Sequence, residues 1–279
     1  MRVAYITAGS AGMICGSCLR DNALANALLE MGCDISLIPT YTPVRSEGQD
    51  ASINRVFLGG INVYLQQRFR LFRQLPKFLD RPLDYPKLLK WASSRGIETS
   101  APILGELTVS MLRGVQGNQA KEVLRLVDFL KSIRPEIVNL TNVLIGGVIP
   151  KIKSDIGVPV VVTLQGDDFF LEQLSHRYRS RALTLISEII PHVDGFIVFN
   201  QYYRDHMSSF LGIPKERIYC LPLGADVKGF PTAPPSKKEE SSRRIGYLAR
   251  ICPEKGYGAL VDAFIQLKQL PDMGDVVLD

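Results

Sequence analysis

Residues 159–168 read PVVVTLQGDD, a continuous apolar run followed at once by an amide, a glycine and two carboxylates. A β-branched run without polar alternation is typical of a strand that is buried on both faces of a parallel sheet. The polar residues then stand at the carboxyl end of that strand, where open α/β sheets bind their ligands. This stretch therefore predicts both an α/β fold and the edge of the sheet that carries a site.

Similar apolar runs alternate with helical patterns along the chain. Strand-like runs occupy residues 3–7, 35–39, 137–140, 195–199 and 217–221, and helical spacing is found over 19–31, 120–134 and from about 200 to 211. Strands separated by helices predict a Rossmann-like, doubly wound parallel sheet with helices on both faces. Residues 66–114 interrupt this rhythm, and we expect them to form a helical insertion.

A second domain is predicted after a proline- and serine-rich stretch. Residues 231–243 have the composition of a linker, so the first domain is expected to span 1–230. From residue 244 a second Rossmann-like domain begins with a strand, a loop and a helix, and the chain ends within its next strand at Asp279. We expect this domain to be C-terminally truncated.

Composition favours a soluble, cytoplasmic protein. Hydrophobic residues make up 46% and charged residues 22% of the chain, no run approaches the length of a membrane span, and the five cysteines have no framework spacing. The net charge is +5, and residues 68–95 alone contribute +6, with eight Lys or Arg against two Asp, so the rest of the chain is close to neutral. This basic, aromatic segment is either a solvated helical insertion or a peripheral contact with an anionic membrane. Nucleic acid is not an expected partner, because the charge is local.

The first strand runs into a glycine-rich loop. Gly9, Gly12 and Gly16 would let backbone N–H groups approach a ligand closely, and Arg20 at the start of the next helix could contact an anion. The spacing is not GxGxxG and no acidic residue ends the second strand, which argues against a nicotinamide site. A loop that is merely tight remains the alternative.

The same loop contains Cys15 and Cys18. This CxxC pair invites a redox or metal interpretation, but no second cysteine pair or close histidine pair exists to complete a zinc site. We expect no metal site, and we expect His176, His192 and His206 to be structural.

Other strand ends also carry polar residues. Gln165, Gly166 and Asp167 follow the 159–164 run, suit sugar hydroxyls and are the predicted catalytic residues, although an aspartate here could simply cap the next helix. Asn142 and Asn200 follow two further strands and are additional candidates.

The predicted second domain opens with two cations. Residues 250–256 read RICPEKG between a strand and a helix, so Arg250 and Lys255 would flank the start of the helix. An arginine fork, a lysine point charge and unpaired helix N–H groups together can bind a diphosphate.

These motifs resemble the retaining glycosyltransferases of the GT-B fold, in particular glycosyltransferase family 4. The resemblance rests on the glycine-rich loop with residues 19–24, the Gly-Asp after the buried strand, PLGAD at 222–226 and the R-x-x-x-E-K-G loop. The N-terminal part is also similar to glycogen and starch synthases.

The resemblance implies transfer of a sugar from a nucleotide-diphosphate sugar to a carbohydrate, lipid-linked or small-molecule acceptor, with retention of configuration. It further implies that Arg250 and Lys255 neutralise the leaving diphosphate, and that no metal or other cofactor is needed. The family commonly has histidine where this chain has Gln165, and an amide cannot act as a base near neutral pH. The family's later pair of glutamates would lie beyond Asp279, so we expect this polypeptide alone to be inactive or nearly so.

Two other functions remain open from the sequence. One is a non-catalytic domain that binds glycans or phosphosugars, and the other is a CxxC oxidoreductase.

Overall fold

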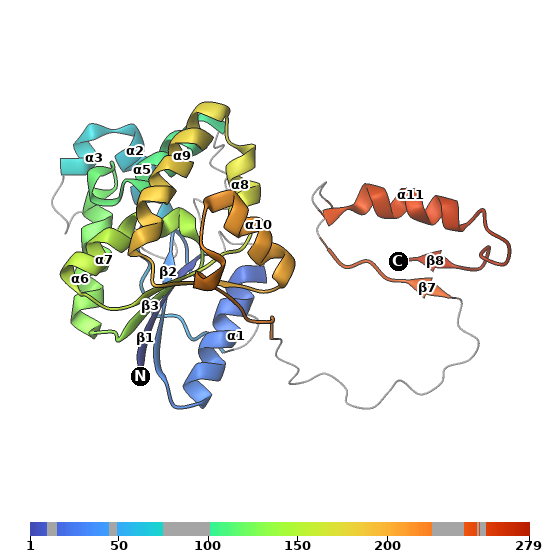
Figure 1. Ribbon diagram of the computed structural model, residues 1–279, viewed down its shortest axis with the longest axis horizontal. Helices are drawn as coiled ribbons and strands as arrows, with labels where there is room; N and C mark the ends of the chain where they lie inside the picture. Colours follow the sequence, from blue (N-terminus) through green and yellow to red (C-terminus); the bar gives the residue numbers. More distant parts are fainter. Residues whose placement is uncertain (10–15, 45–48, 75–100, 225–242, 250, 252–254) are drawn as a thin grey trace. The chain divides into compact units, whose positions relative to one another are not determined.

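The structure is a computed structural model, and it describes residues 1–9, 16–44, 49–74, 101–224, 243–249, 251 and 255–279 (Figure 1). The chain forms two compact units, Met1–Asp226 and Val227–Asp279. Most of the linker predicted at 231–243 lies outside the described residues.

The first unit is built on a six-stranded parallel sheet with the order β2-β1-β3-β4-β5-β6. The strands are β1 (Arg2–Ala8), β2 (Asp34–Thr40), β3 (Ile137–Leu140), β4 (Val160–Thr163), β5 (Gly195–Val198) and β6 (Ile218–Cys220). The chain starts at β1, moves outward to β2, and returns to β3 on the other side of β1. The direction of winding therefore reverses between β1 and β3, as in doubly wound α/β folds.

Helices connect the strands of this unit. They are α1 (Gly16–Glu30), α2 (Gly60–Arg68), α3 (Arg70–Gln74), α5 (Ala101–Leu112), α6 (Ala120–Ile133), α7 (Ile149–Asp155), α8 (Asp167–Gln173), α9 (His176–Ile189) and α10 (Gln201–Leu211). Short 3-10 turns are η3 (Gly114–Gln116), η4 (Val143–Val148), η5 (Ile190–His192) and η6 (Lys215–Arg217). The predicted insertion at 66–114 thus begins within α2 and includes α3, α5 and the first residue of η3, and its residues 75–100 lie outside the described part.

The sheet is covered on both faces, which explains the unbroken apolar runs of its strands. In β1, Ala4 and Ile6 belong to the main core, whereas Val3 and Tyr5 belong to a smaller cluster on the opposite face. The main core joins β1, β3, β4 and β5 to helices α6, α7 and α9 through fully or almost fully buried side chains, among them Leu126, Leu130, Leu140, Ile149, Val162, Ile186 and Phe196.

The packed face of helix α1 is not the one marked by the apolar residues of the helical pattern predicted over 19–31. Its buried residues are Cys18, Asp21, Asn22 and Ala25, while Leu24 and Met31 are exposed. Asn22 is buried because its side chain bonds the backbone of the segment that follows β2, accepting from Ala51 N and donating to Gln49 O. The helix therefore packs through polar contacts that an apolar pattern does not report.

The second unit contains β7 (Arg244–Ile245), α11 (Tyr257–Leu267) and β8 (Val277–Leu278), with the two strands paired in parallel. The strand expected from residue 244 is short, because only Arg244 and Ile245 pair with β8. Among the described residues of this unit only Val276 is buried.

Candidate functional site

A polar cluster lies at the carboxyl ends of β1, β3 and β4, at the point where the winding of the sheet reverses. Its centre is Asp21 in the second turn of α1, whose carboxylate is completely buried. Asp21 accepts hydrogen bonds from Tyr5 Oη at 2.8 Å, Thr7 Oγ1 at 2.5 Å and Thr141 Oγ1 at 2.8 Å. These hydroxyls come from β1 and from the residue after β3, so one carboxylate ties helix α1 to two neighbouring strands.

Arg20 extends this cluster towards β4. Its guanidinium pairs with Asp21, donates to Gln165 Oε1 at 2.6 Å, and lies 4.8 Å from the ring centre of Phe199. The Arg20 side chain is 13% exposed, so the cation is mostly desolvated, and its partners Gln165 and Phe199 lie just after β4 and β5. A cation held in this way at a sheet edge is well suited to bind an anionic group of a ligand.

Gln165 is fixed by the same cluster. Its Oε1 accepts from Arg20, and its Nε2 donates to Thr141 Oγ1 at 2.9 Å and to Thr141 O at 3.1 Å. Both ends of the amide are therefore engaged within the protein. In this arrangement Gln165 positions Arg20 and Thr141.

Asp167, the first residue of α8, holds the loop after β4 by bonding backbone amides. Its two carboxylate oxygens accept from Gln165 N at 2.8 Å and Val143 N at 2.9 Å, and its side chain is almost fully buried. Burial raises the pKa of Asp167 to about 7, although the backbone N–H groups partly offset that rise. The preceding Gly166 has φ +68, a left-handed conformation that favours glycine.

A second group of contacts joins α8 to α10. The Tyr203 hydroxyl accepts from Gly166 N at 2.8 Å and donates to Asp168 Oδ1 at 2.7 Å, while His206 Nε2 lies 2.9 Å from Asp168 Oδ2. Partial burial and the hydrogen bond to Asp168 raise the pKa of Tyr203. His206 was expected to be only structural, and the structure places it on this carboxylate beside the strand ends.

The two asparagine candidates lie at helix starts. Asn142 accepts from Ile145 N at 3.2 Å at the start of η4, and Asn200 accepts from Tyr203 N at 2.7 Å at the start of α10. Both side chains act as N-caps in this structure.

The glycine-rich loop is described only at its ends, and Gly12 and Cys15 lie outside the described residues. Gly9 donates its N–H to Thr40 O at 2.7 Å, and a Cβ at this position would lie 1.7 Å from Thr42 O. Gly9 is therefore required for the close approach of this loop to β2. Gly16 begins α1, and the buried Cys18 thiol donates to Ala8 O at 2.7 Å, an inward position that gives a redox role no support.

In the second unit, Arg250 lies outside the described residues. Lys255 is exposed, and its backbone carbonyl accepts from Tyr247 Oη at 3.1 Å. It directly precedes Gly256, the N-cap of α11, which agrees with the position expected for it at the start of a helix.

Within the described residues no group of three or more His, Cys, Asp or Glu is arranged to hold a metal ion. Sequence reasoning named Arg20, Gln165 and Asp167, but it gave no role to Tyr5, Thr7 or Phe199. Each of these is a common strand residue on its own, and the signal that could have found them is their place within β1 or just after β5.

The fold of this chain is similar to that of a solved glycosyltransferase. The structure of the lipopolysaccharide outer core galactosyltransferase WaaB in its apo form is similar with a TM-score of 0.51 at 14% sequence identity, covering 100% of this chain and 60% of that one. Acinetobacter baumannii MurG aligns with a TM-score of 0.43 at 11% identity, covering 100% and 65% of the two chains. The match to WaaB shows that the fold is that of the GT-B glycosyltransferases, and this chain spans about 60% of the length of WaaB.

A further structural match is the spinosyn rhamnosyltransferase SpnG complexed with thymidine diphosphate, with a TM-score of 0.43 at 14% identity over 100% of this chain and 64% of that one. Residues 108–228 match the family model described as Glycosyltransferase Family 4. The matched region includes β3 to β6 and the loop with Gln165 and Asp167, and it covers less than half of the chain. A search of curated proteins gives no match.

Proposed function

We propose that this chain belongs to a glycosyltransferase that transfers a sugar from a nucleotide-diphosphate sugar to an acceptor with retention of configuration. The observation that carries the proposal is the Arg20–Asp21–Gln165 cluster, which lies at the switch point of the sheet, where doubly wound folds bind ligands. The family match over residues 108–228 gives independent support for glycosyl transfer. Retention is proposed on the resemblance of the motifs alone.

In this proposal the first unit binds the acceptor. Arg20 is the residue that contacts a polar or anionic group of the substrates, since it is the cation oriented at the strand ends by Asp21 and Gln165. Gln165 and Asp167 act as positioning residues: Gln165 orients Arg20, and Asp167 fixes the Gln165 backbone. Gly12 and Gly16 would admit a ligand close to the backbone before α1, and Gly9 holds this loop against β2.

The second unit would contact the donor. Arg250 and Lys255 are proposed to stabilise the negative charge that grows on the leaving diphosphate as the glycosidic bond breaks. The exposure of Lys255 beside the start of α11 is consistent with that task. The proposed reaction needs no metal or other cofactor, because the two cations balance the charge.

The place of the reaction is also a proposal. No helix in the described part of the chain is long and apolar enough to cross a membrane. We propose that the enzyme works in the cytoplasm. The segment 68–95, raised as a peripheral membrane contact, is described only over 68–74.

The test is a panel of nucleotide sugars offered to the protein expressed from its complete reading frame, with release of the nucleoside diphosphate as the signal. Nuclear magnetic resonance of the product then gives the anomeric configuration. We expect one nucleotide sugar to be turned over with retention, and Arg20→Ala to lower kcat/KM by about a hundredfold through loss of an oriented charge.

A matched control is Lys131→Ala. Lys131 is also paired with a carboxylate, Asp155, but lies in the last turn of α6, which leads to the start of β3 and not to its carboxyl end. Its substitution is expected to leave kcat/KM unchanged. The proposal would be refuted if no nucleotide sugar were turned over and no nucleotide in the panel raised the thermal stability of the protein. A glycan-binding domain would then be the second candidate.

A further inference from the structure

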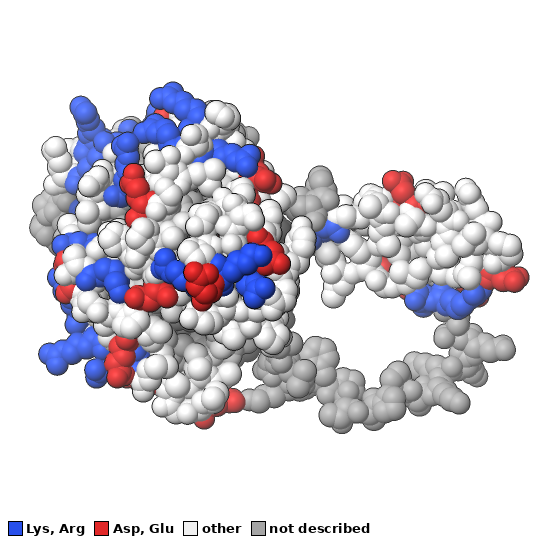
Figure 2. Space-filling view, viewed as in Figure 1, with Lys and Arg blue, Asp and Glu red and all other residues white. Residues whose placement is uncertain are grey.

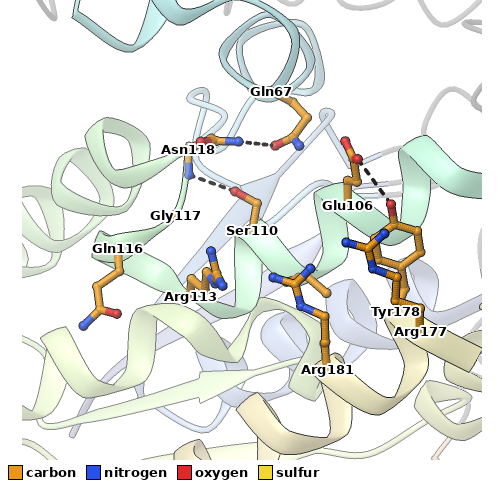
Figure 3. Close-up of a pocket in the computed structure, with 11 residues that line it drawn as sticks. Gln67, Glu106, Ser110, Arg113, Gln116, Gly117, Asn118, Arg177, Tyr178 and Arg181 are labelled. Atoms are coloured by element: carbon orange, nitrogen blue, oxygen red, sulfur yellow. Dashed lines mark hydrogen bonds between the residues drawn. The ribbon is translucent and has the colours of Figure 1, made fainter.

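A polar cavity lies between α5, α9, the end of α2 and the turn after α5 (Figure 3). It is separate from the Arg20–Asp21 cluster. Its volume is about 250 Å³. Among its described lining residues Val109 is the only apolar side chain, and none of them belongs to the cluster at the strand ends. A cavity of this size and polarity suits a small charged molecule better than an apolar ligand.

Three arginines dominate the cavity. Arg113 comes from the residue after α5, and Arg177 and Arg181 come from α9. Figure 3 shows their head groups following one another along one side of the cavity, with Ser110 and Asn118 nearby. In Figure 2, Lys and Arg side chains gather over the part of the first unit where Figure 1 labels α2, α3, α5 and α9.

The positions of Arg177 and Arg181 are unfavourable for the helix by itself. They are four residues apart on α9, so their like charges face each other, and Arg177 lies in the first turn, where the helix dipole disfavours a cation. The first turn of α9 contains no acidic residue. An anion bound between the two guanidinium groups would remove both penalties.

Within the described residues, no ion pair joins a carboxylate to Arg113, Arg177 or Arg181, and Glu106 is the one carboxylate that lines the cavity. Glu106 Oε1 instead accepts from Tyr178 Oη at 3.2 Å. Three guanidinium groups against one carboxylate leave the cavity with a positive balance. The charge is not neutralised by the described residues that form it.

The opposite side of the cavity is rigidly built. Ser110 Oγ accepts from Asn118 N at 2.8 Å and donates to the buried Gln119 Oε1 at 2.7 Å, and Asn118 Nδ2 donates to Gln67 Oε1 at 3.0 Å. This network fixes the turn that follows α5 in relation to α2. The arginines therefore face a preformed polar wall, and a ligand would not have to order it.

We infer that this cavity is a binding site for a phosphate-bearing ligand, a phosphate monoester or a diphosphate, held by Arg113, Arg177 and Arg181. Guanidinium groups bind phosphate oxygens through paired, charge-assisted hydrogen bonds, and three of them match a group with two or more negative charges. The site is distinct from the Arg20–Asp21 cluster, with which it shares no residue.

The test is isothermal titration calorimetry with pyrophosphate and with glycerol phosphate at 0.15 M salt. We expect the wild-type protein to bind both probes, and Arg113→Gln or Arg181→Gln each to weaken one of the bound equivalents by about tenfold, the effect of one lost charge-assisted contact. Pyrophosphate bound at the proposed Arg250 and Lys255 site would not be weakened by these two substitutions. Glutamine keeps a polar side chain of similar reach, and circular dichroism checks that each variant is folded.

The matched control is Arg179→Gln on the same helix. Arg179 does not line the cavity, and it pairs with Glu172 at 3.6 Å. Its substitution is expected to leave the affinity for pyrophosphate unchanged. The inference would be overturned if the wild type bound neither the soluble phosphates nor the anionic vesicles described below. It would also be overturned if the Arg113→Gln/Arg181→Gln double variant bound the probes as tightly as the wild type.

A second arm distinguishes the source of the phosphate group. Co-sedimentation with phosphatidylglycerol vesicles is compared with co-sedimentation with neutral phosphatidylcholine vesicles, for the wild type and the double variant. Binding to the anionic vesicles that the double variant loses assigns the site to a lipid headgroup. Binding of soluble phosphates without binding of vesicles assigns the site to a soluble ligand. If no soluble phosphate binds, and the double variant still binds the anionic vesicles, the proposed site is contradicted.

Discussion

The two units begin from the same local pattern, a strand followed by a loop and an amphipathic helix. Only the first unit buries the apolar side chains of its helices in a core. Helix α6 has Leu126 and Leu130 at 0% exposure, whereas in α11, all of which the structure describes, no residue is buried. The first unit provides six paired strands and helices on both faces, and the second provides two short strands. Local pattern is enough to form a helix, but burial requires neighbours from distant parts of the chain.

The difference in burial between α6 and α11 is tested most directly by a pair of large-to-small substitutions. Leu126→Ala should lower the unfolding free energy of the first unit by about 3 kcal/mol, because it leaves a cavity in a closed core. Ile265→Ala on α11, where the side chain is 53% exposed, should change stability by less than about 0.5 kcal/mol. Urea unfolding monitored by circular dichroism measures both. Equal losses would show that α11 is packed as tightly as α6.

A second prediction compares a buried carboxyl of the first unit with an exposed one of the second. The pKa of Asp167 is raised by burial from 3.8 to about 7, so its contribution to stability is complete below pH 4 and is lost as pH rises towards 7. Relative to Asp167→Asn, the wild type should lose unfolding free energy over this range, with a slope of at most about 1.4 kcal/mol per pH unit. Urea midpoints at several pH values give the slope.

Asp275 in the second unit provides the opposite sign. Its hydrogen bond with Arg243 lowers the pKa of Asp275, so the contribution is present at neutral pH and is lost in acid. Hydrogen exchange at β8 should therefore be faster in Asp275→Asn than in the wild type at neutral pH, with the difference disappearing in acid. If the contributions of Asp167 and Asp275 to stability changed in the same direction with pH, the difference between the two aspartates would not come from burial.

The smallest expected effect concerns helix starts. Asn200 caps α10 with its side chain, whereas Gly256 at the start of α11 makes no side-chain cap. Asn200→Ala should destabilise the first unit by about 1 kcal/mol, and Asn200→Asp, which keeps the acceptor oxygen, should restore most of that loss. Thermal unfolding reports the difference. A large loss of activity in the stable Asn200→Asp variant would instead point to contact with substrate.

Comparison of the sequence with the structure shows where prediction worked. The runs at 137–140, 195–199 and 217–221 are strands of the parallel sheet, and the helical spacing at 120–134 is α6, because continuous apolar runs and 3.6-residue periodicity are local signals. The apolar spacing of α1 predicted the helix but not its packed face. That face is set by Asp21 and Asn22, whose partners come from other strands and loops.

The sequence by itself determined the class of fold, the alternation of strands and helices, and the polar loops at strand ends, because each depends on residues close together in the chain. Only the tertiary structure decided that Arg20 meets Gln165 across 145 residues, that Asp21 is buried beneath three hydroxyls, and that Arg113 and Arg181 line one cavity. Those contacts depend on strand order and helix packing. Contacts across such distances are not encoded in any local pattern.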